Sequence, residues 1–246
     1  MLPNWLHGGA AKCASTWLWR VCKGHPEICV PETPDNVNFF TVHYQRGLDW
    51  YQRQYFSNYA GEPVVGEFSN SYLWHVPAIE RIARDLPGVR MTFLLRNPID
   101  RAYLAWAHLH LKNKPSGLDM RKGIGIPFEK VLDHHGHSWF GMWIDPGYYA
   151  RHLKNLFRFI PRERVRVMIY DDLKADNASV LRGLWEWLGV DPDYTSPLVG
   201  KDVNPDPADL WDYLKPEVRA ELVEVYREDN AKLCEMLGRD LTGWLT

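Results

Sequence analysis

Short apolar runs alternate with longer amphipathic stretches along most of the chain. Short apolar runs are typical of buried strands, and apolar positions three or four apart are typical of helices that pack on a sheet. The alternation predicts an α/β fold whose central parallel sheet is flanked by helices. The expected strands are Trp5–His7, Val64–Glu67, Val89–Leu95 and Val165–Tyr170. The expected helices are Ser15–Lys23, Ile99–Leu111, Tyr148–Ile160, Ser179–Leu188 and Pro216–Leu237.

Residues 113–145 interrupt this alternation with Pro, Gly, His and aromatic residues. The stretch is too long for a simple connection, so it predicts a functional loop or lid. His134, His135 and His137 invite a metal interpretation, but no acidic or cysteine partner stands beside them and we expect no metal site. The length of 246 residues fits one domain covering 1–246.

The composition excludes several classes of partner. A net charge of -2 gives no global attraction for a polyanion, so we expect no nucleic-acid partner and only a local anion site. The four cysteines show no CxxC spacing, which favours free thiols in a reducing compartment. The first residues lack a signal-peptide pattern, and no apolar run approaches the ~18 residues of a membrane span. We therefore expect a cytoplasmic location without membrane insertion; the oligomeric state is not indicated.

A glycine-rich turn with a lysine joins the first strand to the first helix. Backbone amides at a helix start point toward a bound anion, and a nearby lysine adds positive charge, so this turn predicts a phosphate site. A Walker A loop places lysine directly before Ser/Thr, whereas Lys12 here precedes Cys13 and Ala14, which disfavours an ATPase or GTPase. Small residues before a helix also serve tight packing. The candidate binding residues are Ala11, Lys12, Cys13, Ala14, Ser15 and Thr16.

Arg96 follows the expected strand Val89–Leu95, and Pro98 suits the first turn of the next helix. Open α/β sheets bind ligands at the carboxyl ends of their strands. Arg96 can therefore bind a second phosphate with two parallel hydrogen bonds. The alternative is an ion pair with a local carboxylate such as Asp100.

These residues together resemble the sulfotransferases that use 3′-phosphoadenosine 5′-phosphosulfate (PAPS), especially their bacterial and heparan-sulfate-type branch. Residues 9–18 look like the family's 5′-phosphosulfate loop, and residues 95–103 look like its 3′-phosphate segment. Further similar segments, in the family's order, are 38–40, 47–51, 66–72, 226–230 and 237–244. The resemblance covers nearly the whole chain and implies a P-loop-NTPase-like three-layer domain. Residues 113–145 would then be a lid on the acceptor side.

The resemblance also implies roles for individual residues. Lys12, Ser15 and Thr16 would hold the 5′-phosphosulfate, and Arg96 the 3′-phosphate. Charge grows on the leaving phosphate during sulfuryl transfer, so Lys12 and preorganised backbone amides would lower the barrier electrostatically. No metal is expected. The acceptor would be a hydroxyl or amine of a small molecule, lipid or carbohydrate.

Three positions depart from the family's pattern. Asn36 stands where a glutamate commonly acts as the base, and an amide cannot accept the proton. Phe68 replaces a usual lysine, and Leu104 replaces a serine that assists 3′-phosphate binding. These changes keep open a catalytically degenerate nucleotide-binding or scaffold protein of the same fold. An ATP-dependent small-molecule kinase is the further alternative.

With Asn36 unable to act, the base must come from elsewhere. Glu67 ends an expected strand, and burial would raise its proton affinity into a useful range, so we predict that it carries the role of base. The alternative is that Glu67 is a structural hydrogen-bond acceptor. His43 and His7 are rivals, since imidazole suits general-base work, although lone histidines are more often packed or surface residues. We expect Lys12, Glu67 and His43 to be the catalytic candidates. Asp171 and Asp172 are expected in a strand-end turn, not in a Mg²⁺ site.

Overall fold

The computed structural model describes residues 1–33, 36–108, 127–132, 143–201 and 214–246. They form two compact units, one of residues 1–95 with 155–205 and one of residues 96–154 with 206–246. Each unit is described by itself below. The expected single domain over 1–246 stays a prediction. The expected lid, 113–145, lies for the most part outside the described residues.

The first unit contains a five-stranded parallel sheet of order β2-β3-β1-β4-β5. Burial explains the strands, because β1, β3 and nearly all of β4 are covered on both faces and consist mostly of apolar residues. The sheet confirms the predicted α/β class. Its strands are β1 (Trp5–His7), β2 (Ile28–Cys29), β3 (Val64–Phe68), β4 (Arg90–Leu95) and β5 (Val165–Ile169).

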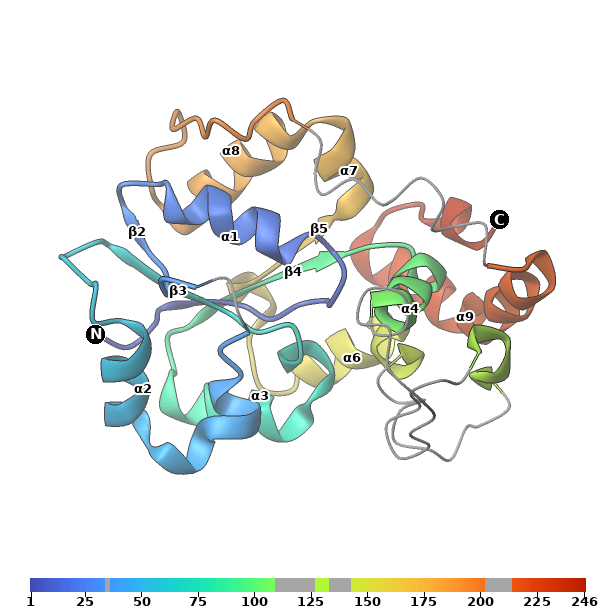
Figure 1. The fold of residues 1–246 in the computed structure, drawn as a ribbon, viewed down its shortest axis with the longest axis horizontal. Helices are drawn as coiled ribbons and strands as arrows, with labels where there is room; N and C mark the ends of the chain where they lie inside the picture. Colours follow the sequence, from blue (N-terminus) through green and yellow to red (C-terminus); the bar gives the residue numbers. More distant parts are fainter. Residues whose placement is uncertain (34–35, 109–126, 133–142, 202–213) are drawn as a thin grey trace. The chain divides into compact units, whose positions relative to one another are not determined.

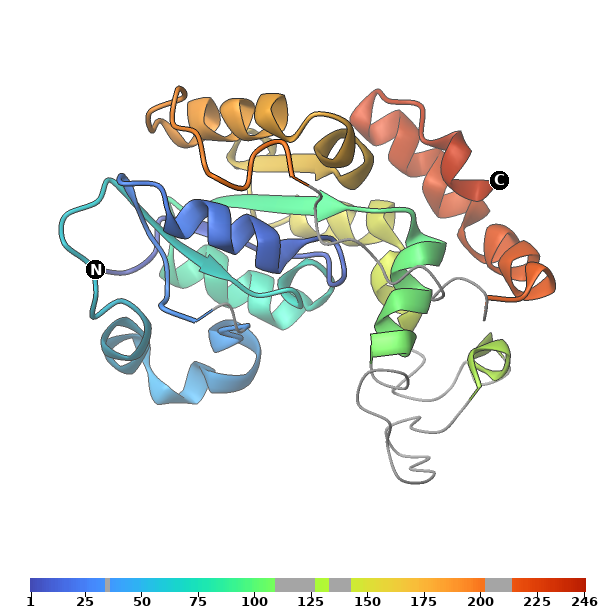
Figure 2. The same ribbon diagram turned by 45° about the horizontal axis from the view of Figure 1, so that its top comes forward.

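Helices cover both faces of this sheet (Figures 1 and 2), with α1 and α8 on one face and α2 and α3 on the other. Arg90 of β4 fixes one of them, because its guanidinium donates to the carbonyls of Trp187 (2.6 Å) and Leu188 (2.7 Å) at the end of α8. The helices of this unit are α1 (Ser15–Lys23), α2 (Leu48–Tyr55), α3 (Val76–Asp85), α7 (Tyr170–Ala175) and α8 (Asn177–Leu188).

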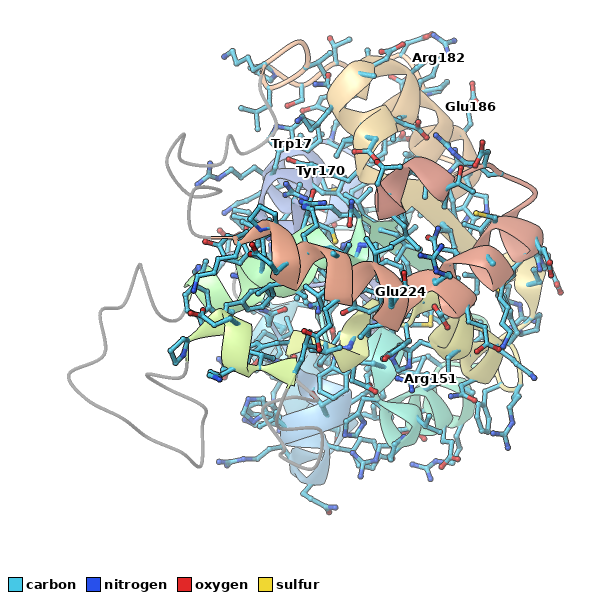
Figure 3. All side chains as sticks on the ribbon, turned by 90° about the vertical axis from the view of Figure 1, so that its right-hand side faces the viewer. Trp17, Arg151, Tyr170, Arg182, Glu186 and Glu224 are labelled. Atoms are coloured by element: carbon cyan, nitrogen blue, oxygen red, sulfur yellow. The ribbon has the colours of Figure 1, made fainter. Side chains whose placement is uncertain are left out.

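The structure contains helices and a strand that the sequence pattern did not predict. Strand β2 and helices α2 and α3 were not predicted. Asp171 and Asp172 lie in the first turn of α7, so the expected strand-end turn is a helix. The exposed side of α8 carries an ion pair between Arg182 and Glu186, one turn apart (Nε to Oε1 3.4 Å, Figure 3).

The second unit is helical, with a core of aromatic and aliphatic side chains from α4 (Pro98–Ala107), residues 128–144 as far as described, and α9 (Pro216–Leu237). Asn97 caps α4 by accepting from the backbone N–H of Ile99 (2.9 Å), and Pro98 occupies the first turn as predicted. Helix α6 (Tyr149–Leu156) spans the boundary between the units.

Asp229 of α9 anchors the start of α6. Its carboxylate accepts from the backbone N–H groups of Ala150 (2.9 Å) and Arg151 (3.0 Å). The N–H groups of a first helical turn have no partner within their own helix, so this carboxylate satisfies two of them. Among the described residues, no helix is long and apolar enough to cross a membrane.

Candidate functional site

The turn between β1 and α1 has an alternating backbone conformation. Lys12 and Ala14 have positive φ angles of 67° and 64°, and Cys13 between them does not. Successive residues of alternating handedness direct their N–H groups toward one concave side, which makes an anion-binding backbone nest. Ser15 then opens α1, whose first-turn N–H groups have no intrahelical partners. The predicted phosphate loop therefore has the backbone geometry that such a site needs.

Two glycines allow this loop to lie close to its neighbours. A Cβ on Gly9, whose φ is +124°, would come within 2.8 Å of the backbone oxygen of Asn70. A Cβ on Gly8 would come within 2.4 Å of the Phe93 ring. Backbone hydrogen bonds continue the contact with β4, from Gly8 N to Thr92 O (2.9 Å) and onward along the loop. The loop is thus fixed between β4 and the segment after β3.

The loop residues differ in accessibility. Ala11, Lys12, Ser15 and Thr16 are partly exposed, whereas Cys13 and Ala14 are buried. The Cys13 thiol donates a hydrogen bond to the backbone oxygen of Ala11 (Sγ to O 3.6 Å), which stabilises the turn. The lysine and the two hydroxyls are therefore the side chains that a bound anion can reach. Cys13 and Ala14 can contribute only their backbone.

Arg96 lies in the second unit, directly after β4, and is 7% exposed. The Tyr149 hydroxyl donates to its backbone oxygen at 2.9 Å, which fixes the main chain at this point. The carboxylate of Asp100, the alternative partner considered for Arg96, forms an ion pair with Arg219 (2.7 Å). Among the described ion pairs, the partner of Asp100 is therefore Arg219.

Glu67 is fully buried on β3, one residue before the strand ends. Its Oε1 accepts from the Ser69 hydroxyl at 2.5 Å, and its Oε2 accepts from the Tyr51 hydroxyl. Burial raises the pKa of Glu67, and the hydrogen bonds from Ser69, Tyr51 and Tyr72 partly oppose that rise. The pKa shift has the direction that a general base needs. Both carboxylate oxygens of Glu67, however, already accept hydrogen bonds from side chains of the protein.

His43 has a more accessible position than Glu67. It ends the π-helical turn Phe39–His43, is partly exposed, and packs against the Trp50 ring at a centroid distance of 5.6 Å. His7 is fully buried beside Thr92 (Nδ1 to Oγ1 3.2 Å), and burial lowers its pKa to about 3. A histidine that binds protons so weakly and has no route to solvent is a core residue. His43 is therefore a better candidate for the base than His7.

The three departures from the family pattern have structural roles. Asn36 is exposed, and its Oδ1 accepts from the backbone N–H of Asn70 at 2.8 Å. Phe68 packs edge-on against Trp5 with ring centroids 5.4 Å apart. Leu104 is 9% exposed and belongs to the apolar core of the second unit. None of these side chains adds a charge to its surroundings.

Sequence reasoning missed the hydroxyl groups around Glu67. Tyr51, Ser69 and Tyr72 all contact this carboxylate. Ser69 and Tyr72 stand within residues 66–72, one of the segments that carry the resemblance, but nothing in the linear pattern shows that they face Glu67. Among the described residues, no group of three or more His, Cys, Asp or Glu side chains could hold a metal ion. His134, His135 and His137 lie outside those residues.

A family model described as sulfotransferase domain matches residues 6–199, so the chain belongs to the sulfotransferase family. It is a transferase by this membership. A sulfotransferase crystal structure from Alicyclobacillus acidocaldarius aligns over the full length of both chains with 26% identity and a TM-score of 0.80. The P-loop-like three-layer fold predicted from the resemblance is thereby confirmed.

Two further comparisons define the limits of the match. A mouse sulfotransferase solved in complex with PAP covers 94% of this chain and 87% of that one, at 12% identity and a TM-score of 0.55, which shows likeness of fold alone. The mouse bifunctional heparan sulfate N-deacetylase/N-sulfotransferase 4 is 26% identical over 99% of this chain. This chain spans only 31% of that relative, so the activities of the whole relative do not transfer with the match.

Proposed function

We propose that this sulfotransferase takes its sulfuryl group from PAPS and transfers it to a hydroxyl or amine of a small-molecule, lipid or carbohydrate acceptor. The observation that carries the proposal is the backbone nest at Lys12–Ala14, held between β4 and the segment after β3 and opening onto the start of α1. Such a nest with an adjoining lysine fits a sulfated or phosphorylated group. The mouse sulfotransferase complexed with PAP has the same fold.

Within this proposal, different residues bind different parts of the PAPS molecule. The loop's backbone N–H groups and the Ser15 and Thr16 hydroxyls orient the 5′-phosphosulfate. The acceptor forms its bond to sulfur as the bond from sulfur to the bridging oxygen breaks, and negative charge collects on the departing phosphate. The Lys12 ammonium group stabilises that charge. Arg96 binds the 3′-phosphate, a group that does not react.

The acceptor's proton requires a base, and we propose His43 for this role. The imidazole is partly exposed and is held against Trp50, whereas the Glu67 carboxylate is buried and hydrogen-bonded. A base must come within hydrogen-bonding reach of the proton it removes. That requirement favours the accessible side chain over the buried one.

Calorimetric titration with 3′-phosphoadenosine 5′-phosphate, compared with AMP, tests the donor. We expect binding of the 3′-phosphorylated nucleotide and a much weaker response to AMP. Equal affinity for the two nucleotides would refute the PAPS assignment and favour an ATP-dependent kinase. Strong discrimination without any turnover of PAPS across an acceptor screen would favour the catalytically degenerate scaffold protein.

We also propose a cytoplasmic location. The four cysteines support it, because Cys13, Cys22, Cys29 and Cys234 are all free thiols. Free thiols are typical of a reducing compartment. Fractionation of the native host, with immunodetection of the chain, tests the proposal, and recovery in a membrane or secreted fraction would refute it.

A further inference from the structure

The buried Glu67 carboxylate is the centre of a hydrogen-bond network that joins several elements of the first unit. Tyr51 reaches it from α2, Ser69 from just beyond β3, and Tyr72 from the short helix Tyr72–Trp74. A carboxylate only accepts hydrogen bonds, so the Tyr51 and Ser69 hydroxyls each use their single proton on Glu67. The Tyr72 hydroxyl adds an interaction that helps to lower the pKa of Glu67. Each hydroxyl oxygen also has the capacity to accept a hydrogen bond.

Two of the hydroxyls use that capacity on one backbone segment. The Ser69 hydroxyl accepts from the backbone N–H of Asn38 at 2.8 Å. The Tyr72 hydroxyl accepts from the backbone N–H of Phe40 at 3.2 Å. The carboxylate therefore determines which way the Ser69 hydroxyl points, and that direction makes its oxygen available as an acceptor. Without the carboxylate, the Ser69 hydroxyl could rotate and compete as a donor.

The segment that receives these bonds has an unusual conformation. Asn38 is left-handed, with φ of 51°, and it begins the π-helical turn Phe39–His43. The Asn38 carbonyl accepts from the N–H groups of Val42 (2.8 Å) and His43 (3.3 Å), so the orientation of Asn38 sets the end of the turn. Such conformations are uncommon and persist only where surrounding contacts hold them. His43 is the last residue of this turn.

We propose that Glu67 is a positioning residue, which holds the turn Phe39–His43 in place through the Ser69 hydroxyl, with the Tyr72 hydroxyl as a second contact of the same turn. The catalytic part of this inference rests on the proposed function, because it assumes that the network serves to position His43, the proposed base. It differs from the expectation that Glu67 itself removes the proton. A positioning residue acts through its neighbours, and removing a neighbour must then have the same effect.

The experiment compares Glu67→Gln with Ser69→Ala. Glutamine keeps the size of the side chain but brings an N–H₂ donor against hydroxyl groups that also donate. Alanine at position 69 leaves Glu67 unchanged and removes the link to Asn38. Glu62→Gln is the matched control, because Glu62 precedes the same strand, is only partly buried, and accepts from the backbone N–H of Ala60, outside the network.

Hydrogen exchange of the 38–43 segment, followed by mass spectrometry, is the readout that does not depend on activity. We expect faster exchange of this segment in Glu67→Gln and in Ser69→Ala, and unchanged exchange in Glu62→Gln. Unchanged exchange in both network variants would refute the proposal. Since this measurement needs no substrate, it distinguishes failure of the network from failure of the sulfotransferase assignment, which nucleotide titration tests separately.

Kinetics give the second readout. A misplaced catalytic group costs up to about 10²-fold in rate, so we expect kcat to fall by about 10- to 100-fold in both variants, with nucleotide affinity unchanged. The acidic limb of the pH profile should keep its midpoint, because the proton acceptor is unchanged. The double variant should lose no more than the worse single variant, since both changes interrupt one connection.

The opposite pattern would overturn the proposal. If Glu67→Gln abolished the acidic limb while Ser69→Ala kept wild-type kcat, Glu67 would be the base. If Glu67→Gln fails to fold, Ser69→Ala and Tyr72→Phe still test the inference, because each removes one backbone contact of the turn and leaves the carboxylate in place. Wild-type exchange and kcat in both of these variants would refute it.

Discussion

The Tyr51 hydroxyl donates a hydrogen bond to the Glu67 carboxylate, and both side chains are fully buried. The contact joins α2 to β3. Burial and the adjacent carboxylate raise the pKa of Tyr51 well above its ordinary value, so the phenol remains a donor at any physiological pH. The same carboxylate accepts from the Ser69 hydroxyl, which in turn accepts from Asn38, so the contact contributes both to the stability of the first unit and to the position of the turn Phe39–His43.

Tyr51→Phe is expected to destabilise the fold by about 1–3 kcal/mol, because it leaves a buried acceptor with one donor fewer. Urea unfolding measures the change as a lower midpoint. Tyr55→Phe is the control on the same helix, since Tyr55 is only partly buried. Equal stability of the two variants would mean that the Tyr51 hydroxyl contributes nothing beyond its ring.

Lys12→Ala is expected to lower kcat by about 10²–10³-fold, the usual cost of losing one group that stabilises transition-state charge. The fold should be preserved, because Lys12 is partly exposed in a loop. Circular dichroism and turnover of PAPS measure the two quantities. Lys23→Ala, at the far end of α1, is the control with wild-type activity expected. Near-wild-type turnover by Lys12→Ala would remove the loop from the mechanism.

Arg96→Ala is expected to raise KM for PAPS while changing kcat little, because the 3′-phosphate is bound equally in ground and transition states. Calorimetry should show that the loss affects 3′-phosphoadenosine 5′-phosphate and leaves the weak AMP response unchanged. Arg96→Lys keeps the charge but not the paired hydrogen bonds and should fall between alanine and wild type. A fall in kcat with KM constant would place Arg96 at the reacting centre.

Contiguous features were predictable from the sequence, and features assembled across the chain were not. The loop around Lys12 was found because its glycines, its lysine and its hydroxyls follow one another between an apolar run and a helix. Helix α3 was missed because its N-cap is His75, which accepts from Ala78 N at 3.1 Å, and not one of the residues that usually mark a helix start. The surroundings of Glu67 come from three elements that no local pattern relates.

The stability of the chain should fall below neutral pH because of His7. Burial lowers the pKa of His7 to about 3 in the folded state, against an ordinary value of 6.5 in the unfolded chain. Between these values the unfolded chain binds a proton that the folded chain does not, so stability is fully present above about pH 6.5 and declines as the pH falls. His7→Gln cannot titrate and should flatten this dependence. Urea midpoints of both proteins across pH 7.5 to 5 measure it, and parallel curves would contradict the prediction.

His43→Gln is expected to lower kcat by about 10²–10⁴-fold at neutral pH, the usual contribution of a positioned general base. Nucleotide affinity should be unchanged, because His43 lies on the turn Phe39–His43 and not on the loop around Lys12. The variant should also lose the acidic limb of the pH profile, since that limb reports protonation of the base. Gln45→Ala, at an exposed position two residues further on, is the control. Full kcat in His43→Gln across pH 6 to 9 would exclude His43 as the base. Combined with an unchanged acidic limb, it would return the role to Glu67, and the buried carboxylate would then have to exchange the Ser69 hydroxyl for the acceptor during turnover.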